Sequence, residues 1–261
     1  MTIDLREARV LLTGATGGLG HAIARALHAE GAVLTITGRR AEALDALSTE
    51  LGATALTADL ARPEAPEELL EQAGPVDVII ANAALPGVGQ LTNFSIDKID
   101  RNLAVNLRAP IALARGALPA MLERGSGHLV FVGSVAGITA SPGGSMYSAT
   151  KFGLRGFADG LRQELHGTGV GVSTVMPGFV RDAGMFADSG MRLPPGVRTV
   201  SPEQVANSVV RAILRNKGEI VAAPLEVRIA AKLGSLAPAV NAAVQRIAGA
   251  AEISAMHRGA S

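Results

Sequence analysis

Cysteine is absent from this chain of 261 residues, and aromatic residues make up only 3% of it. The absence of cysteine excludes disulfides, thiolate zinc sites and a cysteine nucleophile, and it is compatible with the reducing cytoplasm, where we expect the protein to work. Because large rings are scarce, the core must be built mainly from Ala, Val, Leu and Ile, which suits close packing of helices on a sheet. We therefore expect an α/β fold.

Strong net charge and long hydrophobic runs are also missing. The formal charge is +1 and the basic residues are scattered, which argues against nucleic acid as a partner. The long charge-free stretches, 78–96 and 125–150, are interrupted by Gly, Pro, Asn and Ser, and the N-terminus lacks the order of a signal peptide. We expect neither secretion nor stable membrane insertion. The five histidines show no metal-ligand spacing, so no metal site is expected.

Short runs rich in Val, Ile and Leu alternate with Ala-rich helical patterns. Strands are predicted at 9–13, 32–37, 53–58, 76–81, 128–133, 170–176 and 219–222. Helices are predicted near 19–30, 41–51, 64–73, 96–122, 145–167 and 202–215. Unbroken apolar strands separated by helices indicate a parallel sheet that is covered on both faces. The expected architecture is a Rossmann-like, doubly wound sheet in a single domain.

The chain carries no Pro-, Ser- or Gly-rich linker. We predict a catalytic domain over residues 1–224 and a helical C-terminal extension over 225–261. The segment from Asp182 to Ser201 contains several glycines and prolines and follows the carboxyl end of a strand, where ligands bind in doubly wound folds. This segment is a candidate for a mobile lid, and a plain surface connection is the alternative.

Glycines cluster where the first predicted strand runs into the first helix, in the sequence TGATGGLG at 13–20. Such glycines let the backbone approach a pyrophosphate, while the helix offers unpaired N–H groups and the positive end of its dipole. The spacing is Gly-x-x-x-Gly-x-Gly, which differs from the Gly-x-Gly-x-x-Gly of many dehydrogenases. The residues expected to contact a dinucleotide here are Gly14, Thr16, Gly18, Leu19 and Gly20.

Tyr147, the only tyrosine, precedes Lys151 by four residues in a predicted helix, so the phenol and the ammonium share one face. A neighbouring cation favours the phenolate and can lower the tyrosine pKa from its usual value of about 10 into a useful range. Taken alone, this spacing is common among ordinary surface pairs. Ser134, at the end of a predicted strand, and Asn106, in a predicted helix, make a catalytic interpretation stronger.

The Gly-rich loop followed in order by Asn106, Ser134, Tyr147 and Lys151 resembles the short-chain dehydrogenase/reductase family over about residues 8–222. The resemblance implies an NAD(P)-dependent oxidoreductase that interconverts a carbonyl and a secondary alcohol. It also implies that Tyr147 exchanges a proton with the substrate oxygen and that Ser134 fixes and polarises this oxygen. Lys151 would bind the nicotinamide ribose and lower the tyrosine pKa, and Asn106 would support a water in a proton path.

The same resemblance assigns further cofactor contacts outside the Gly-rich loop. They are Asp59, Leu60, Asn82, Pro177, Gly178 and Val180, together with Tyr147 and Lys151. Asp59 is expected at the adenine amino group, Asn82 near the ribose and Val180 at the carboxamide.

Two positions depart from the family pattern. Ala84 replaces a glycine beside the cofactor, which would tighten the site slightly. Asp182 stands where a threonine is usual, so one hydrogen bond to the cofactor is in doubt. A negative charge near phosphate is unfavourable unless Arg181 offsets it.

The second predicted strand ends at Thr37-Gly38-Arg39, with no acid where NAD-specific relatives bind the ribose 2′-hydroxyl. Arginine instead suits a 2′-phosphate. We therefore predict that NADP is preferred over NAD, with Arg39 as the main contact and Thr16 as a helper. The alternative is that Arg39 only stacks on the adenine.

The sequence is compatible with three functions. The leading one is a carbonyl reductase or alcohol dehydrogenase, and the others are an epimerase or dehydratase on the same fold and a nucleotide-sensing protein without catalysis. Residues expected around the substrate are Leu85, Ile138, Thr139, Met185, Phe186 and Met191, whose apolar character indicates an apolar carbonyl or alcohol. The resemblance also implies a homodimer or homotetramer packed through the Tyr147 helix and the helix near 202–215.

The C-terminal extension shows an amphipathic helical stripe. Its apolar members are Leu225, Ile229, Leu233, Leu236, Val240, Val244 and Ile247, and its basic residues are Arg228, Lys232 and Arg246. Pro238 is expected to kink or divide the helix. The stripe could pack on its own domain or a neighbouring subunit, lie on an anionic membrane surface, or cover the mouth of the substrate site.

Overall fold

Seven parallel strands form one sheet in the computed structural model, which describes residues 3–182, 198–237, 239 and 242–243. The strands are β1 (Arg9–Thr13), β2 (Val33–Gly38), β3 (Thr54–Thr57), β4 (Val78–Ala81), β5 (Gly127–Val132), β6 (Val170–Pro177) and β7 (Glu219–Ala222). Their order across the sheet is β3-β2-β1-β4-β5-β6-β7. This arrangement confirms the predicted Rossmann-like fold, and every predicted strand is present with small changes at its ends.

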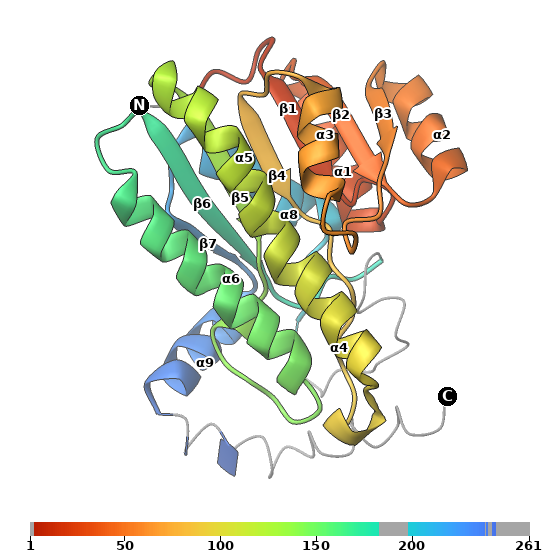
Figure 1. The fold of residues 1–261 in the computed structure, drawn as a ribbon. Coiled ribbons are helices and arrows are strands. Elements are labelled where there is room, and N and C mark those ends of the chain that lie inside the picture. The colour runs from red at the N-terminus through yellow and green to blue at the C-terminus, as the bar shows by residue number, and fades with distance from the viewer. Residues whose placement is uncertain (1–2, 183–197, 238, 240–241, 244–261) are drawn as a thin grey trace.

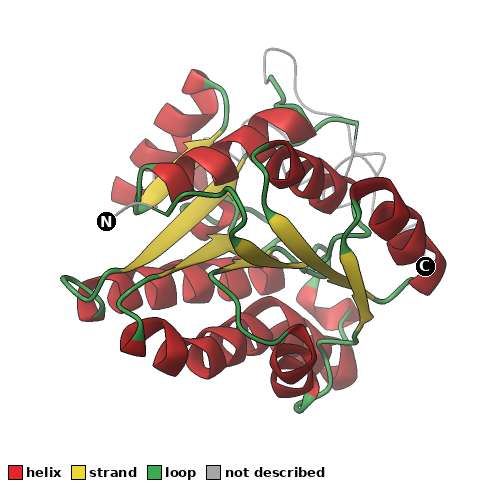
Figure 2. Ribbon diagram, turned by 90° about the horizontal axis from the view of Figure 1, so that it is seen from above, coloured by secondary structure: helices red, strands yellow, loops and turns green. Residues whose placement is uncertain are grey.

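Helices cover both faces of the sheet, as Figure 2 shows from above. They are α1 (Gly18–Ala29), α2 (Ala41–Leu51), α3 (Ala65–Ala73), α4 (Ile96–Leu103), α5 (Ala109–Glu123), α6 (Ser145–Glu164), α8 (Pro202–Leu214) and α9 (Leu225–Leu236). One apolar cluster packs α1, α2 and α8 against the sheet, and a second packs α3, α5 and α6 against its other face. Every residue of β4, β5 and β6 is buried, which explains why these strands read as continuous apolar runs.

The strand order reverses at β1, which pairs with β2 on one side and with β4 on the other. The chain leaves β3 at one end of the sheet and re-enters it as β4 beside β1. In such folds the loops at the carboxyl ends of the two central strands diverge and leave a crevice for a ligand. The Gly-rich loop after β1 and the loop after β4 therefore border the expected binding site.

The prediction of one continuous α-helix over 96–122 is wrong. The segment consists of α4, a π-helical turn at Ala104–Arg108 and α5, with Asn106 inside the turn. Pro110 has no N–H to donate to the carbonyl of Asn106, four residues earlier, so the regular α-helical ladder is interrupted at this point. A π-helical turn accommodates this interruption, and such turns are frequent at functional sites.

The apolar stripe of α9 points away from the domain, so it does not pack on its own sheet. Leu225, Ile229, Leu233 and Leu236 are 62%, 50%, 61% and 76% exposed. Ala231 and Gly234 form the buried side instead, because small residues let the helix backbone approach closely. Pro238, Met185, Phe186, Met191, Val240, Val244, Ile247, Arg246 and most of the predicted lid lie outside the described residues.

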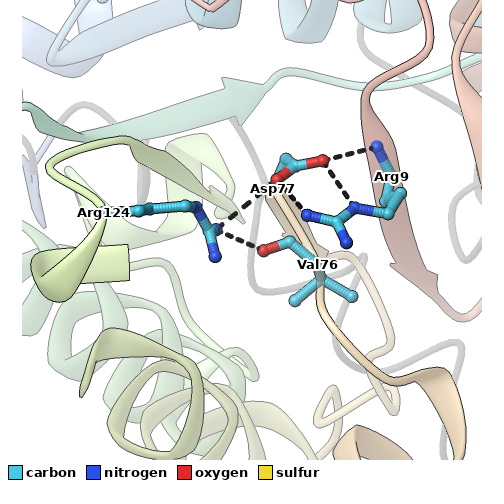
Figure 3. Close-up of polar contacts among 4 residues, drawn as sticks. All are labelled: Arg9, Val76, Asp77 and Arg124. Atoms are coloured by element: carbon cyan, nitrogen blue, oxygen red, sulfur yellow. Dashed lines mark hydrogen bonds and ion pairs between the residues drawn. The ribbon is translucent and has the colours of Figure 1, made fainter. Parts of the chain in front are cut away.

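Asp77 organises the edge of the sheet at which the strands begin (Figure 3). Its carboxylate accepts hydrogen bonds from the Arg9 backbone at 3.0 Å and from the Arg9 guanidinium at 2.9 and 2.8 Å. Arg124, after α5, lies 3.6 Å from the same carboxylate and donates to the Val76 carbonyl. Hydrogen bonds from Arg9 hold the pKa of Asp77 below its usual value. This cluster joins β1, β4 and α5 at the edge opposite the candidate site.

Candidate active site

The Gly-rich loop joins β1 tightly to α1. Gly14 has a φ of +67°, and a Cβ atom at Gly20 would lie 2.2 Å from the Gly14 carbonyl oxygen. Gly17 and Gly18 are exposed at the start of α1, where no side chain caps the helix and no acid stands in the first turn. An uncapped helix start of this kind presents N–H groups and a positive dipole end to an anion. The loop therefore fits a pyrophosphate.

Two adjacent arginines follow β2 and have different surroundings. Arg40 donates a hydrogen bond to the carbonyl of Thr16 and so holds the Gly-rich loop. Arg39 is exposed and makes no hydrogen bond or ion pair with another described residue. The Thr16 side chain lies against Gly38, since a Cβ atom at Gly38 would be 2.9 Å from the Thr16 hydroxyl oxygen. Thr16 and Arg39 thus border the same corner of the site.

Asp59, just after β3, is tied to α4. Arg101 donates to both of its carboxylate oxygens at 2.8 and 3.1 Å, and the Ala61 N–H donates to one of them at 3.1 Å. Partial burial opposes ionisation of Asp59, but these hydrogen bonds and the nearby charges of Arg101 and Arg39 together hold its pKa below the usual value. Arg101 was not anticipated from the sequence, because the two residues are 42 positions apart. The next residue, Leu60, is buried.

Asn82 bridges the ends of the two central strands. Its side-chain amide donates to the carbonyls of Thr13 at 3.0 Å and Gly14 at 3.2 Å. The Thr13 hydroxyl in turn accepts the N–H groups of Asn82 and Ala83, each at 3.0 Å. Asn82 therefore fixes the separation of the two loops that border the crevice.

Asn106 holds the loop that follows β4. Its carboxamide accepts the Leu85 N–H at 2.7 Å and donates to the Leu85 carbonyl at 2.9 Å. The same amide lies 3.4 Å from the Thr150 hydroxyl, which donates to the Tyr147 carbonyl at 2.9 Å. The Tyr147 N–H donates to the Gly87 carbonyl at 3.1 Å. The π-helical turn, the loop and the tyrosine-bearing helix are thus locked together.

Tyr147 and Ser134 meet at the carboxyl ends of the strands. Ser134 follows β5 and accepts the N–H of Ala136 at 3.1 Å, which fixes its hydroxyl at the start of a short helical turn. Tyr147 lies in the first turn of α6 and is half-buried as a residue. Burial raises the pKa of Tyr147 to about 12, and a hydrogen bond from the Ser134 side chain offsets part of that rise.

Lys151 lies one turn after Tyr147 and is only 2% exposed. Its ammonium donates to the carbonyl of Val132 at 2.8 Å and lies 5.5 Å from the centre of the Tyr147 ring. Burial lowers the pKa of Lys151 to about 8. The four residues of the predicted set therefore gather in one region, linked by hydrogen bonds and short contacts.

The expected lowering of the tyrosine pKa by Lys151 is not observed. The ammonium is directed to the Val132 carbonyl, and burial opposes charge on both groups. A tyrosine with a raised pKa keeps its proton at neutral pH, which is the form needed to protonate a carbonyl.

The loop after β6 lies against the last strand and α9. The Gly178 N–H donates to the Ala222 carbonyl at 3.0 Å, and a Cβ atom at Gly178 would lie 3.0 Å from that of Ala223. Val180 is buried and pairs with Val200 in an isolated parallel β-bridge. Arg181 lies 3.3 Å from Asp182 and offsets its charge, as the sequence required.

The sequence model of a family described as short chain dehydrogenase matches residues 8–192. The chain belongs to this family. The chain is similar to the ketoacyl reductase HetN of Nostoc sp., with 40% identity over 221 residues, or 81% of this chain and 77% of the relative. Dehydrogenase/reductase SDR family member 7B of Bos taurus is 35% identical over 260 residues, or 91% of this chain and 80% of the relative. This short chain dehydrogenase is an oxidoreductase.

Solved structures of short chain dehydrogenases superpose well on this one. An enzyme of Sphingobium yanoikuyae, solved in complex with NADPH, is 28% identical, with a TM-score of 0.76 and coverage of 89% of this chain and 93% of the other. The closed form of a serine dehydrogenase complexed with NADP+ is 31% identical, with a TM-score of 0.73 and coverage of 81% and 94%.

Proposed function

We propose that this short chain dehydrogenase reduces an apolar carbonyl compound to a secondary alcohol with NADP(H), and that Tyr147 is its proton donor. The observation that carries the proposal is the Tyr147 phenol, which keeps its proton, receives a hydrogen bond from Ser134 and lies beside a buried lysine. A group of this kind at the carboxyl edge of a doubly wound sheet suits proton transfer to a bound substrate oxygen.

Three side chains have separate roles in the proposed reaction. The Ser134 hydroxyl, fixed by its bond to Ala136, orients the substrate oxygen beside the phenol. Tyr147 gives its proton to that oxygen, and in the reverse direction it removes the proton. Lys151 lies one turn after the phenol, with its ammonium 5.5 Å from the ring centre and hydrogen-bonded to the Val132 carbonyl, and we assign to it the binding of the nicotinamide ribose. The nicotinamide, when bound, supplies the hydride.

Asn106 would bind a water in the proposed proton path. Its side chain binds the Leu85 backbone, and Pro110 has no N–H to donate to the Asn106 main-chain carbonyl, so we propose that this carbonyl binds the water.

We propose that Arg39 selects NADP. It is exposed and forms no hydrogen bond or ion pair with another described residue, although its charge helps to lower the pKa of nearby Asp59, whereas Arg40 is tied to the phosphate loop. A guanidinium whose N–H groups have no acceptor in the described part of the chain suits a 2′-phosphate, because charge-assisted hydrogen bonds to phosphate are strong. Relatives solved with NADPH and NADP+ support this choice.

We propose an apolar acyl or aliphatic carbonyl as the substrate. Ile138, four residues after Ser134, is buried against Met176 and Ala231, and Leu85 is held in place by Asn106. The ketoacyl reductase among the relatives is consistent with such a substrate. We also propose that the protein forms a homodimer or homotetramer and that it works in the cytoplasm.

Substituting Tyr147→Phe tests the function. The variant should lose NADPH oxidation with every carbonyl that the natural protein reduces, while fluorescence titration still shows NADPH binding. Near-normal turnover would refute the assignment. A product formed without net change in NADPH absorbance would instead favour an epimerase or dehydratase, and cofactor binding without turnover in the natural protein would favour a sensor.

A further inference from the structure

The outward side of α9 is an apolar stripe next to the active-site edge. Leu225, Ile229, Leu233 and Leu236 are four, four and three residues apart, so they form one side of the helix. All four are at least half exposed. The helix lies at the end of the molecule toward which the strands run, because it follows the carboxyl end of β7 (Figure 1).

The opposite side of α9 anchors the helix to the site. Val227 approaches Gly178, with 3.8 Å from its methyl carbon to a Cβ atom built on that glycine. Ala231 is buried with Ile138 and Met176, and the Met176 sulfur lies 2.4 Å from a Cβ atom built on Gly133, next to Ser134. The stripe is therefore carried by a helix that is fixed on the loop after β6 and on Met176, which lies against Gly133 beside Ser134.

Positive charge borders the stripe on one side. Arg228 and Lys232, one turn apart, are exposed and form no ion pair within the described residues. The only acid of the helix, Glu226, is bound by Arg198 through two hydrogen bonds of 2.8 Å, which neutralises it. Long basic side chains beside an apolar stripe can extend to phosphate groups while their stems cover apolar surface.

We propose that the outward face of α9 binds an anionic lipid surface. An exposed apolar stripe with a cationic border is the pattern of a helix that lies in the plane of a bilayer interface. Four side chains on one helix are far fewer than the roughly 20–30 residues per side of a stable protein interface. No described helix is long and apolar enough to cross a membrane, so the helix would lie on the surface.

A second apolar group lies at the same edge of the sheet. Val88, Leu91 and Ile96, in and after the loop that follows β4, are 42%, 56% and 70% exposed. Because β4 and β7 are parallel, both groups lie at the carboxyl edge, on either side of the proposed substrate site. Resting on the proposed function, the lipid surface would then supply apolar carbonyl substrates directly to that site.

Sedimentation with lipid vesicles tests the proposal on the full chain. The protein should sediment with vesicles of phosphatidylglycerol and phosphatidylcholine, and less with phosphatidylcholine alone or at high salt. Replacing two stripe residues in the double variant Ile229→Gln/Leu233→Gln should weaken partitioning by about tenfold or more. The double variant Arg228→Gln/Lys232→Gln should lose the preference for phosphatidylglycerol.

Val33→Gln is the matched control, because Val33 is 57% exposed at the opposite edge of the sheet. It should sediment like the natural protein, and circular dichroism should show that the α9 variants fold. Natural protein that stays in the supernatant, or stripe variants that bind vesicles unchanged, would overturn the proposal. A smaller oligomer for the stripe variant without lipid would assign the stripe to a second copy and also overturn it. Vesicle binding needs no substrate, so it stands even if no carbonyl is reduced.

Discussion

Arg39 and Arg40 are adjacent in the sequence and are expected to contribute differently to cofactor binding. Arg39→Ala should weaken NADP binding by about 10- to 100-fold, the effect of losing a charged hydrogen bond of about 1.5–3 kcal/mol, and should leave NAD binding nearly unchanged. Arg40→Ala should weaken both cofactors alike, because Arg40 holds the Thr16 carbonyl of the shared phosphate loop. Fluorescence titration with each cofactor measures both effects.

The two arginine variants distinguish recognition of the 2′-phosphate by Arg39 from support of the phosphate loop by Arg40. Equal losses of NADP and NAD binding in Arg39→Ala would show that this arginine only stacks on the adenine. Tighter binding of NAD than of NADP by the natural protein would contradict the proposed preference outright.

At the scale of elements, the contact of α1 with the phosphate loop depends on Gly20. A Cβ atom there would lie 2.2 Å from the Gly14 carbonyl oxygen, so Gly20→Ala must displace the loop or the helix. We expect NADP and NAD affinity to fall by about tenfold or more, since the loop N–H groups no longer converge on the pyrophosphate. Isothermal titration calorimetry with each cofactor measures the loss.

Gly156→Ala, in α6, is the control for a glycine-to-alanine change in a helix. A Cβ atom at Gly156 meets nothing within 4 Å, so its cofactor affinity should be unchanged. Its melting temperature should stay constant or rise, because alanine is favoured over glycine in a helix by up to about 1 kcal/mol. Wild-type affinity in Gly20→Ala would show that the loop does not bind the cofactor.

The elements around Asn106 show how one turn connects distant parts of the chain. The π-helical turn places its carboxamide against Leu85, and Arg101 in α4 reaches Asp59 after β3. Both contacts come from the same helical segment, which therefore supports the proposed adenine end and the proposed catalytic end of the site. The division into a domain of residues 1–224 and an extension of 225–261 stays a prediction.

At the scale of the whole molecule, the buried His128 makes stability depend on pH. Its ring nitrogen lies 2.8 Å from the Ser173 hydroxyl, and burial lowers the pKa of His128 to about 4. The unfolded chain binds a proton near pH 6.5 and the folded chain does not, so stability falls as pH decreases from about 6.5 to 4. The loss attributable to this residue is about 3 kcal/mol at most.

Urea unfolding at several pH values measures this effect. His128→Gln should show a shallower loss of stability than the natural protein between pH 6.5 and 4, whatever its stability at neutral pH. His28→Gln, which changes an exposed histidine in α1, serves as the control and should keep the natural slope. An unchanged slope in His128→Gln would mean that the histidine is protonated in the folded state.

Local sequence patterns were enough to predict the strands and most of the helices, and they single out the residues proposed for catalysis. Strands and helices follow from local periodicity, which needs only neighbouring residues, and the Gly-rich loop and the Tyr147–Lys151 spacing are local as well. The order of the motifs along the chain was enough to indicate the family. Pro110, four residues after Asn106, was a local signal for the interrupted helix that could have been used.

Only the tertiary structure shows which distant residues contact one another at the site, which way the α9 stripe faces and how burial shifts the pKa of Tyr147. The pairs Asp59–Arg101 and Asn106–Leu85 join residues 42 and 21 positions apart, which no local pattern encodes. Periodicity identified the stripe of α9 but not its direction, because only packing shows that Ala231 faces the core. The raised pKa of Tyr147 likewise comes from burial, which depends on the whole fold surrounding the phenol.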